Sequence, residues 1–73
     1  MDDTVKRAAM QATYMAARDA LLSAARAADE AVQATMAGSL NLARGTAVEA
    51  ETCIETARKL MDAAAAVHRL GQK

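Results

Sequence analysis

Apolar and small residues recur every three or four positions along almost the whole chain, which is the period of an amphipathic α-helix. Ala, Met, Leu, Arg, Glu, Lys and Gln dominate, all of which favour helix, and no Pro is present to break one. The apolar stripe changes its heptad register once, around Gly38 and Gly45. We therefore predict two helices, over residues of about 3–37 and about 46–70, with a turn over about 38–45.

A second signal supports this placement of the turn. The segment from Thr46 to Glu49 has the form of a capping box, in which Thr46 caps the first free N–H groups and Glu49 reaches back. Gly71 is expected to end the second helix. The prediction is an all-α, antiparallel helical hairpin forming one domain over residues 1–73. One long helix with a phase shift is the alternative, because Gly is a weak helix breaker.

The two predicted helices differ in length. At 1.5 Å per residue the first would be about 52 Å long and the second about 37 Å. In a hairpin, about ten residues at the N-terminus would then overhang and need another surface to pack against.

Alanine recurs at heptad spacing along both predicted helices. Small side chains let two antiparallel helices approach to about 8 Å, the lower end of the usual range of interaxial distances. We therefore expect these rows to form the seam inside the hairpin. The predicted seam consists of Ala17, Ala20, Ala24, Ala27, Ala31, Ala34, Ala50, Ile54, Ala57, Met61 and Ala64.

The first helix has more apolar surface than one neighbour can cover. A helix that packs on one neighbour needs an apolar stripe only a little wider than about 100°, and here more than half of the circumference is apolar or Ala. A second stripe is therefore predicted to contact another chain. Two hairpins would close into a four-helix bundle, whereas an open repeating contact would give a filament. The predicted inter-chain interface consists of Tyr14, Met15, Leu21, Leu22, Val32 and Met36.

Composition also favours an assembly. The chain has 73 residues, of which 21 are Ala and only 18 belong to other apolar types. Burying large side chains yields roughly 1.5–3 kcal/mol each, a total comparable to or below the cost of ordering the backbone. Cys53 is the only cysteine and His68 the only histidine, so neither an internal disulfide nor a structural zinc site is expected. Oligomerisation or docking on a partner therefore remains as the means of stabilising so small a fold.

The charges are balanced, with nine basic and nine acidic residues distributed evenly on both sides of Gly45. Such a field does not favour nucleic acid or an anionic membrane as a partner. No stretch approaches the roughly 18 apolar residues of a transmembrane helix. The Met-Asp-Asp start lacks the features of a secretory signal, and a single Cys fits a reducing compartment, so we expect a cytoplasmic protein.

Few residues suggest chemistry, and each has a simpler structural interpretation. His68 and Met15 could form an axial pair for haem or copper, but the bulky aromatic walls of such a pocket are missing. Cys53 has no His or Lys one turn away to activate a thiol. The carboxylates within 49–55 lack the Glu-x-x-His spacing of a di-metal site. We predict no catalytic residue, cofactor or metal, and no enzymatic activity.

The sequence therefore predicts a structural or assembly subunit that acts by helix–helix self-association. One alternative is a small adaptor or chaperone that binds a helix of another protein, with its five Met residues as an adaptable surface. A second is an RNA-binding hairpin dimer, which the acidic neighbours of its Arg residues and the lack of stacking aromatics disfavour. A third is a coat on a granule or membrane surface, for which the basic content is low.

Overall fold

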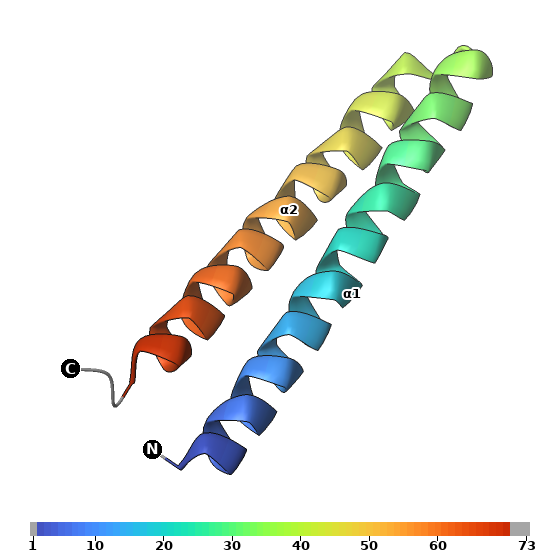
Figure 1. Ribbon diagram of the computed structural model, residues 1–73. Coiled ribbons are helices and arrows are strands. Elements are labelled where there is room, and N and C mark those ends of the chain that lie inside the picture. The colour runs from blue at the N-terminus through green and yellow to red at the C-terminus, as the bar shows by residue number, and fades with distance from the viewer. Residues whose placement is uncertain (1, 71–73) are drawn as a thin grey trace.

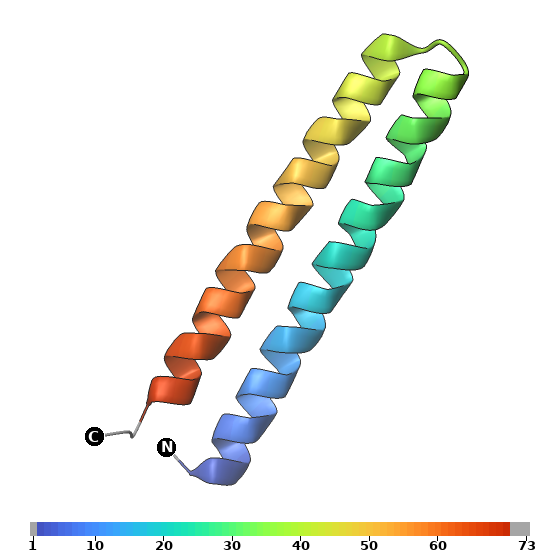
Figure 2. The same ribbon diagram turned by 45° about the horizontal axis from the view of Figure 1, so that its top comes forward.

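The computed structural model describes residues 2–70, which form two long helices joined by a short turn (Figure 1). Helix α1 spans Asp3–Met36 and helix α2 spans Leu40–Arg69. The two helices run antiparallel and lie side by side in both views, with the N- and C-terminal ends together at one end (Figures 1 and 2). The predicted helical hairpin is confirmed, and one continuous helix is excluded. The predicted stop at Gly71 lies outside the described residues.

The turn occupies residues 37–39 and is shorter than the predicted segment 38–45. Gly38 has a φ of 81°, a left-handed conformation that Gly adopts without steric cost. The N–H of Gly38 donates to the carbonyl of Thr35 at 3.0 Å, and the N–H of Ser39 donates to that of Ala34 at 2.8 Å. This pair of bonds is the Schellman pattern, which satisfies the last carbonyls of a helix. Gly38 therefore ends α1 and lets the chain reverse direction within the three residues of the turn.

Gly45 lies inside α2, so the predicted capping box is wrong. The hydroxyl of Thr46 donates to the carbonyl of Leu42 at 2.8 Å, inside the helix, and the Thr46 side chain is buried against α1. A Gly in a helix interior costs only about 1 kcal/mol relative to Ala. An earlier start brings Ala43 into the contact with α1, and this packing outweighs the weak break.

The earlier start of α2 also removes most of the predicted overhang. The ammonium of Lys6 donates to the carbonyl of Leu70 at 3.2 Å, so the two ends of the hairpin finish nearly level. Counting outward from the turn, Ala34 lies level with Ala43, and Ala17 lies level with Leu60. This register determines which side chains of the two helices become neighbours.

The buried part of the contact between the helices is made of small side chains. The buried positions are three, four or seven residues apart along the helices, which is the heptad spacing of a coiled coil. No large side chain among the described residues is fully buried. The buried residues are Ala17, Ala24, Ala27, Ala34, Ala43, Thr46, Ala50, Ala57 and Ala64.

The hairpin is a thin plate. Its Cα atoms extend over 55 × 17 × 10 Å, so it is only one helix thick and both of its broad faces are open. Neither helix, within residues 2–70, carries an apolar stretch of the length needed to cross a lipid bilayer.

The two glycines provide a test of where the turn lies. A Cβ atom at Gly38 or at Gly45 would meet no atom within 4 Å, so only backbone conformation distinguishes the two sites. We expect Gly38→Ala to destabilise the hairpin by about 1–2 kcal/mol, the cost of a left-handed conformation. Gly45→Ala should stabilise it by about 0.5–1 kcal/mol, because Ala favours helix. Urea unfolding followed by circular dichroism measures both, and a Gly45→Ala variant less stable than wild type would contradict this turn.

The alanine seam provides a second test. Ala57 is 1% exposed, so Ala57→Leu should force the helices apart and cost about 1–3 kcal/mol. Ala66 lies on the same helix and is exposed, so Ala66→Leu is the matched control and should leave stability almost unchanged. Thermal unfolding compares the two variants. Equal melting temperatures would show that close approach of the helices is not required.

Candidate interaction face

Most of the large apolar side chains lie on the surface of the hairpin. Their exposed fractions run from 41% for Leu21 to 77% for Met36, although the core beside them is built from alanine. Large exposed apolar patches on soluble proteins mark surfaces that bind another molecule. The exposed large apolar residues are Val5, Tyr14, Met15, Leu21, Leu22, Val32, Met36, Leu40, Leu42, Val48, Ile54, Met61 and Leu70.

Two of these side chains form a row on α1 beside the seam. Tyr14 directly follows the half-buried Thr13, and Leu21 directly follows the half-buried Ala20. Seven residues separate Tyr14 from Leu21, and a further seven lead to Ala28. Because a heptad is close to two helical turns, these three side chains lie in one line along α1.

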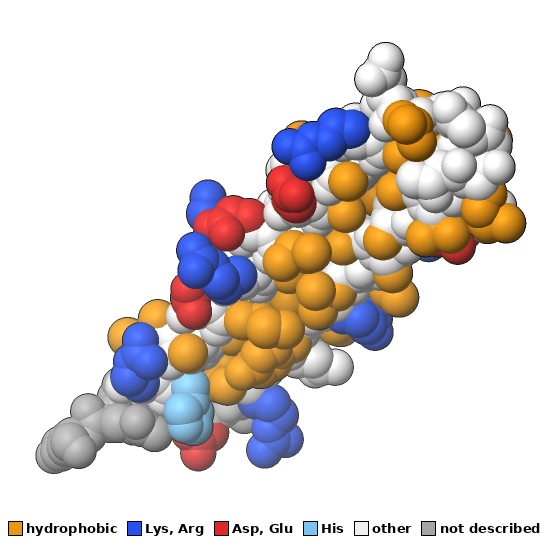
Figure 3. All heavy atoms as spheres, turned by 90° about the horizontal axis from the view of Figure 1, so that it is seen from above, with side chains coloured by type: hydrophobic (Ala, Val, Ile, Leu, Met, Phe, Trp, Pro, Cys, Tyr) orange, Lys and Arg blue, Asp and Glu red, His pale blue; other side chains and the backbone are white. Residues whose placement is uncertain are grey.

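An equivalent row follows the seam of α2. Ile54 follows the half-buried Cys53, Met61 follows the half-buried Leu60, and His68 lies one heptad beyond. Two antiparallel helices are related by an approximate two-fold axis perpendicular to the hairpin plane, so equivalent heptad positions appear on the same face. Figure 3 shows this face as a band of apolar side chains along the molecule, with the histidine near one end.

We call this surface the apolar face and define it by six residues. They are Tyr14, Leu21 and Ala28 of α1 and Ala47, Ile54 and Met61 of α2.

The apolar face changes in bulk along its length. The register of the hairpin places Tyr14 level with Met61 near the chain ends, and it places Leu21 level with Ile54 in the middle. Near the turn, Ala28 lies level with an alanine of α2, Ala47. The apolar face therefore carries large side chains at the terminal end and only alanine side chains at the turn end.

All six residues of the predicted inter-chain interface are exposed, with fractions of 41% or more. Tyr14 and Leu21 lie on the apolar face, and Val32 lies at its α1 edge. The other three, Met15, Leu22 and Met36, lie farther round α1.

The assignment of Ile54 and Met61 to the seam is wrong, since they are 52% and 44% exposed. Cys53 and Leu60, one residue earlier, occupy the seam and are half-buried. The reason is the earlier start of α2, which sets the seam through Ala43 and shifts it round the helix. The structure therefore adds two residues of α2 to a face that the sequence assigned to α1 alone.

The nine alanines predicted for the seam lie between the helices. Two of them, Ala20 and Ala31, are half-buried. The other seven are buried, namely Ala17, Ala24, Ala27, Ala34, Ala50, Ala57 and Ala64.

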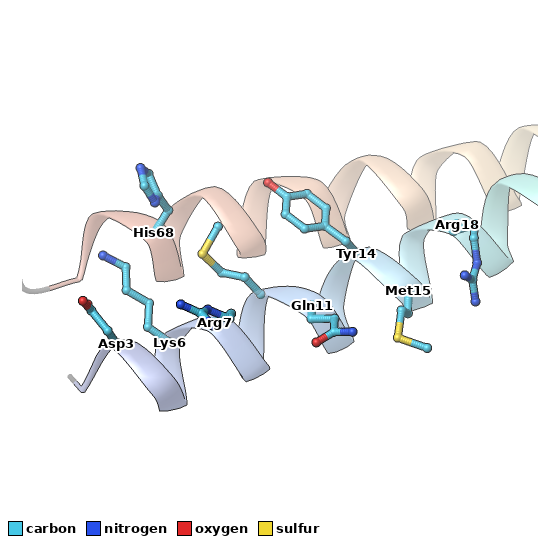
Figure 4. Close-up of a pocket in the computed structure, with 9 residues that line it drawn as sticks. Asp3, Lys6, Arg7, Gln11, Tyr14, Met15, Arg18 and His68 are labelled. Carbon is cyan, nitrogen blue, oxygen red and sulfur yellow. The ribbon is translucent and has the colours of Figure 1, made fainter.

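A groove of about 740 Å³ lies at the terminal end of the apolar face. Apolar side chains line it together with three bases, Lys6, Arg7 and Arg18, and one acid, Asp3. Figure 4 shows Lys6 and Tyr14 pointing from α1 toward α2, where His68 lies. This end of the face is therefore basic, although the chain as a whole is neutral.

The candidate chemical groups are separated in the structure. Figure 4 places His68 at one end of the groove and shows Met15 near the other, pointing away from α2, so these two side chains do not form an axial pair. Cys53 is a free, half-buried cysteine in the seam. Glu55 accepts a hydrogen bond from Arg58 at 2.9 Å in a solvent-exposed ion pair. Within residues 2–70, no three His, Cys, Asp or Glu side chains gather into a metal site.

Comparison of the chain with protein family models, curated proteins and solved structures gives no match. The apolar face is therefore interpreted from its own chemistry.

Proposed function

We propose that the protein is a non-enzymatic assembly subunit that associates with further copies of itself through the apolar face. One observation carries this proposal: most of the large apolar side chains are exposed, while the buried positions are held by alanine and threonine. In a chain that acts alone, burial of large apolar side chains is the main source of stability. In the single hairpin, most large apolar side chains are not buried, so association with a second copy would add this stabilisation.

A second hairpin supplies the missing layer of helices. The isolated plate covers its seam but leaves Leu21 and Ile54 41% and 52% exposed. Packing a second plate on the apolar face would bury these side chains between four helices and gain about 25 cal/mol per Å² of apolar surface. Two helical hairpins with such faces form a four-helix bundle, a common closed architecture.

The chemistry of the face favours association over catalysis. An enzyme site needs a few polar groups that converge inside a concave pocket. The apolar face consists of aliphatic, thioether and aromatic side chains, and the charged side chains lie along its edges. Lys6, one of the basic residues that line the groove, already donates to a backbone carbonyl.

Glutamate substitutions test the face. Leu21→Glu and Ile54→Glu each place a charge at its centre, so we expect both variants to dissociate and to lose helicity together. Val48 is the matched control, because it is 46% exposed but lies on the outer side of α2, away from the face. Val48→Glu should remain assembled. Size-exclusion chromatography with light scattering, over a dilution series, measures mass, and circular dichroism measures helicity.

The wild-type protein must form a discrete oligomer in the same experiment. A fully helical wild-type monomer at all concentrations would contradict self-association. A poorly helical monomer that gains helix on adding another protein would favour the adaptor function instead. Dissociation by Val48→Glu as well as by Ile54→Glu would show that the apolar face is not the specific contact.

A further inference from the structure

We propose that two copies of the hairpin pair through their apolar faces in opposite directions, about a two-fold axis that passes near Leu21 and Ile54. This inference rests on the proposed self-association and specifies its partner and geometry. In this pairing α1 stacks on α1 of the second copy, and α2 stacks on α2. The turn of each hairpin lies at the terminal end of the other.

The distribution of bulk along the apolar face favours this direction. On α1, Tyr14 lies one heptad before Leu21 and Ala28 lies one heptad after it. A two-fold axis at Leu21 therefore places Tyr14 of each copy over Ala28 of the other. A large side chain over a small one fills an interface without voids.

The same complementarity holds on α2. Met61 and Ala47 lie one heptad on either side of Ile54, so the axis places Met61 of each copy over Ala47 of the other. Pairing in the same direction would instead stack α1 on α2 of the second copy. Tyr14 would then meet Met61 at one end, and alanines would face each other across a gap at the other.

Charge along the hairpin also favours opposite directions. The half nearest the turn, residues 21–56, carries two basic and five acidic residues. The described remainder, residues 2–20 and 57–70, carries six basic and four acidic residues. Opposite directions place the basic end of each copy on the acidic end of the other, and complementary potentials of this kind fix register and orientation.

One pair of side chains at the edge of the face makes this preference specific. Glu51 and Arg58 are one heptad apart on α2, on the same edge and on opposite sides of Ile54. With opposite directions, Arg58 of each copy comes about level with Glu51 of the other, which gives two ion pairs by symmetry. With the same direction, Arg58 comes level with Arg18 of the second copy. Figure 3 shows acidic and basic side chains alternating along one edge of the apolar band.

The two arginines at the edges of the apolar face, Arg18 and Arg58, are exposed enough to contact a second copy. The side chains of Arg18 and Arg58 are 60% and 70% exposed, respectively. Arg18 contacts Asp19 at 3.3 Å, and Arg58 contacts Glu55 at 2.9 Å, both within the chain. Exposed ion pairs of this kind are weak, so their guanidinium groups are available to a second copy.

Charge reversal distinguishes the two directions by the sign of its effect. For opposite directions, Arg58→Glu places two carboxylates together at two sites, and we expect the dimer dissociation constant to rise about tenfold. The double variant Glu51→Arg/Arg58→Glu restores both pairs and should return the constant to near the wild-type value. For the same direction, Arg58→Glu would face Arg18 and tighten the dimer.

Sedimentation equilibrium over a dilution series measures these constants. Lys59→Glu is the control, because it makes the same change of charge at the next residue, which lies off the apolar face. It should leave the constant almost unchanged. A tighter dimer with Arg58→Glu, or no recovery in the double variant, would overturn the proposed direction.

Disulfide trapping gives an independent readout of the same geometry. In a Cys53→Ala background, chains carrying Tyr14→Cys are mixed with chains carrying Ala28→Cys and mildly oxidised. We expect the mixed disulfide dimer to form readily for this pair, and to form poorly when Tyr14→Cys chains are mixed with Met61→Cys chains. The reverse pattern would show pairing in the same direction.

The outcomes separate this inference from the proposed function. A wild-type protein that stays monomeric in sedimentation overturns both self-association and the direction. A wild-type dimer that crosslinks through the Tyr14→Cys and Met61→Cys pair overturns the direction alone and leaves self-association in place.

Discussion

Close approach of two helices through alanine is the constraint on which the rest of the structure depends. Methyl groups fill the space between α1 and α2, and Ala17 and Ala64 are completely buried there. A seam this narrow fully buries no large side chain of the described residues, and Leu60 is only half-buried in it. Most of the other large apolar side chains lie on the faces and edges of the plate. The close approach of the two helices through alanine therefore accounts both for the tightly packed core and for the exposed apolar surface.

The turn then decides which side chains share a face. Gly38 reverses the chain within a few residues, and the Schellman bonds fix the point at which α2 begins. The sequence pattern, with a start at Thr46, predicts a seam through Ile54 and Met61. With the start at Leu40, the seam passes through Cys53 and Leu60. Ile54 and Met61 then lie beside Tyr14 and Leu21 on the apolar face. A shift of a few residues in one turn changes the chemistry of a whole surface.

The sequence alone predicts the hairpin but not the residue at which its second helix begins. The hairpin and the alanine row of α1 follow from helical periodicity and small-residue spacing, because both signals extend over many turns. The start of α2 does not follow, since Gly45 resembles a break and its cost of about 1 kcal/mol is smaller than the packing gained at Ala43. The assignment of Ile54 and Met61 to the seam is wrong, because it follows the general expectation that large apolar side chains lie inside. That expectation fails where alanine fills most of the seam and most large apolar side chains stay exposed.

The far side of the plate bears on whether the proposed assembly closes. Apart from Leu42 near the turn, the rows that flank the seam there are small or polar in α1 and α2, with Ala16 and Ser23 on α1 and Thr56 on α2. Glu30 and Glu49 lie about level on that side, so a further hairpin stacked there in the same direction would bring their four carboxylates together. Because bulky side chains and complementary charge lie along one face, that face favours a second copy more than the other does. An isologous contact through a single face uses up that face in both partners, which limits the assembly to two hairpins and disfavours a filament.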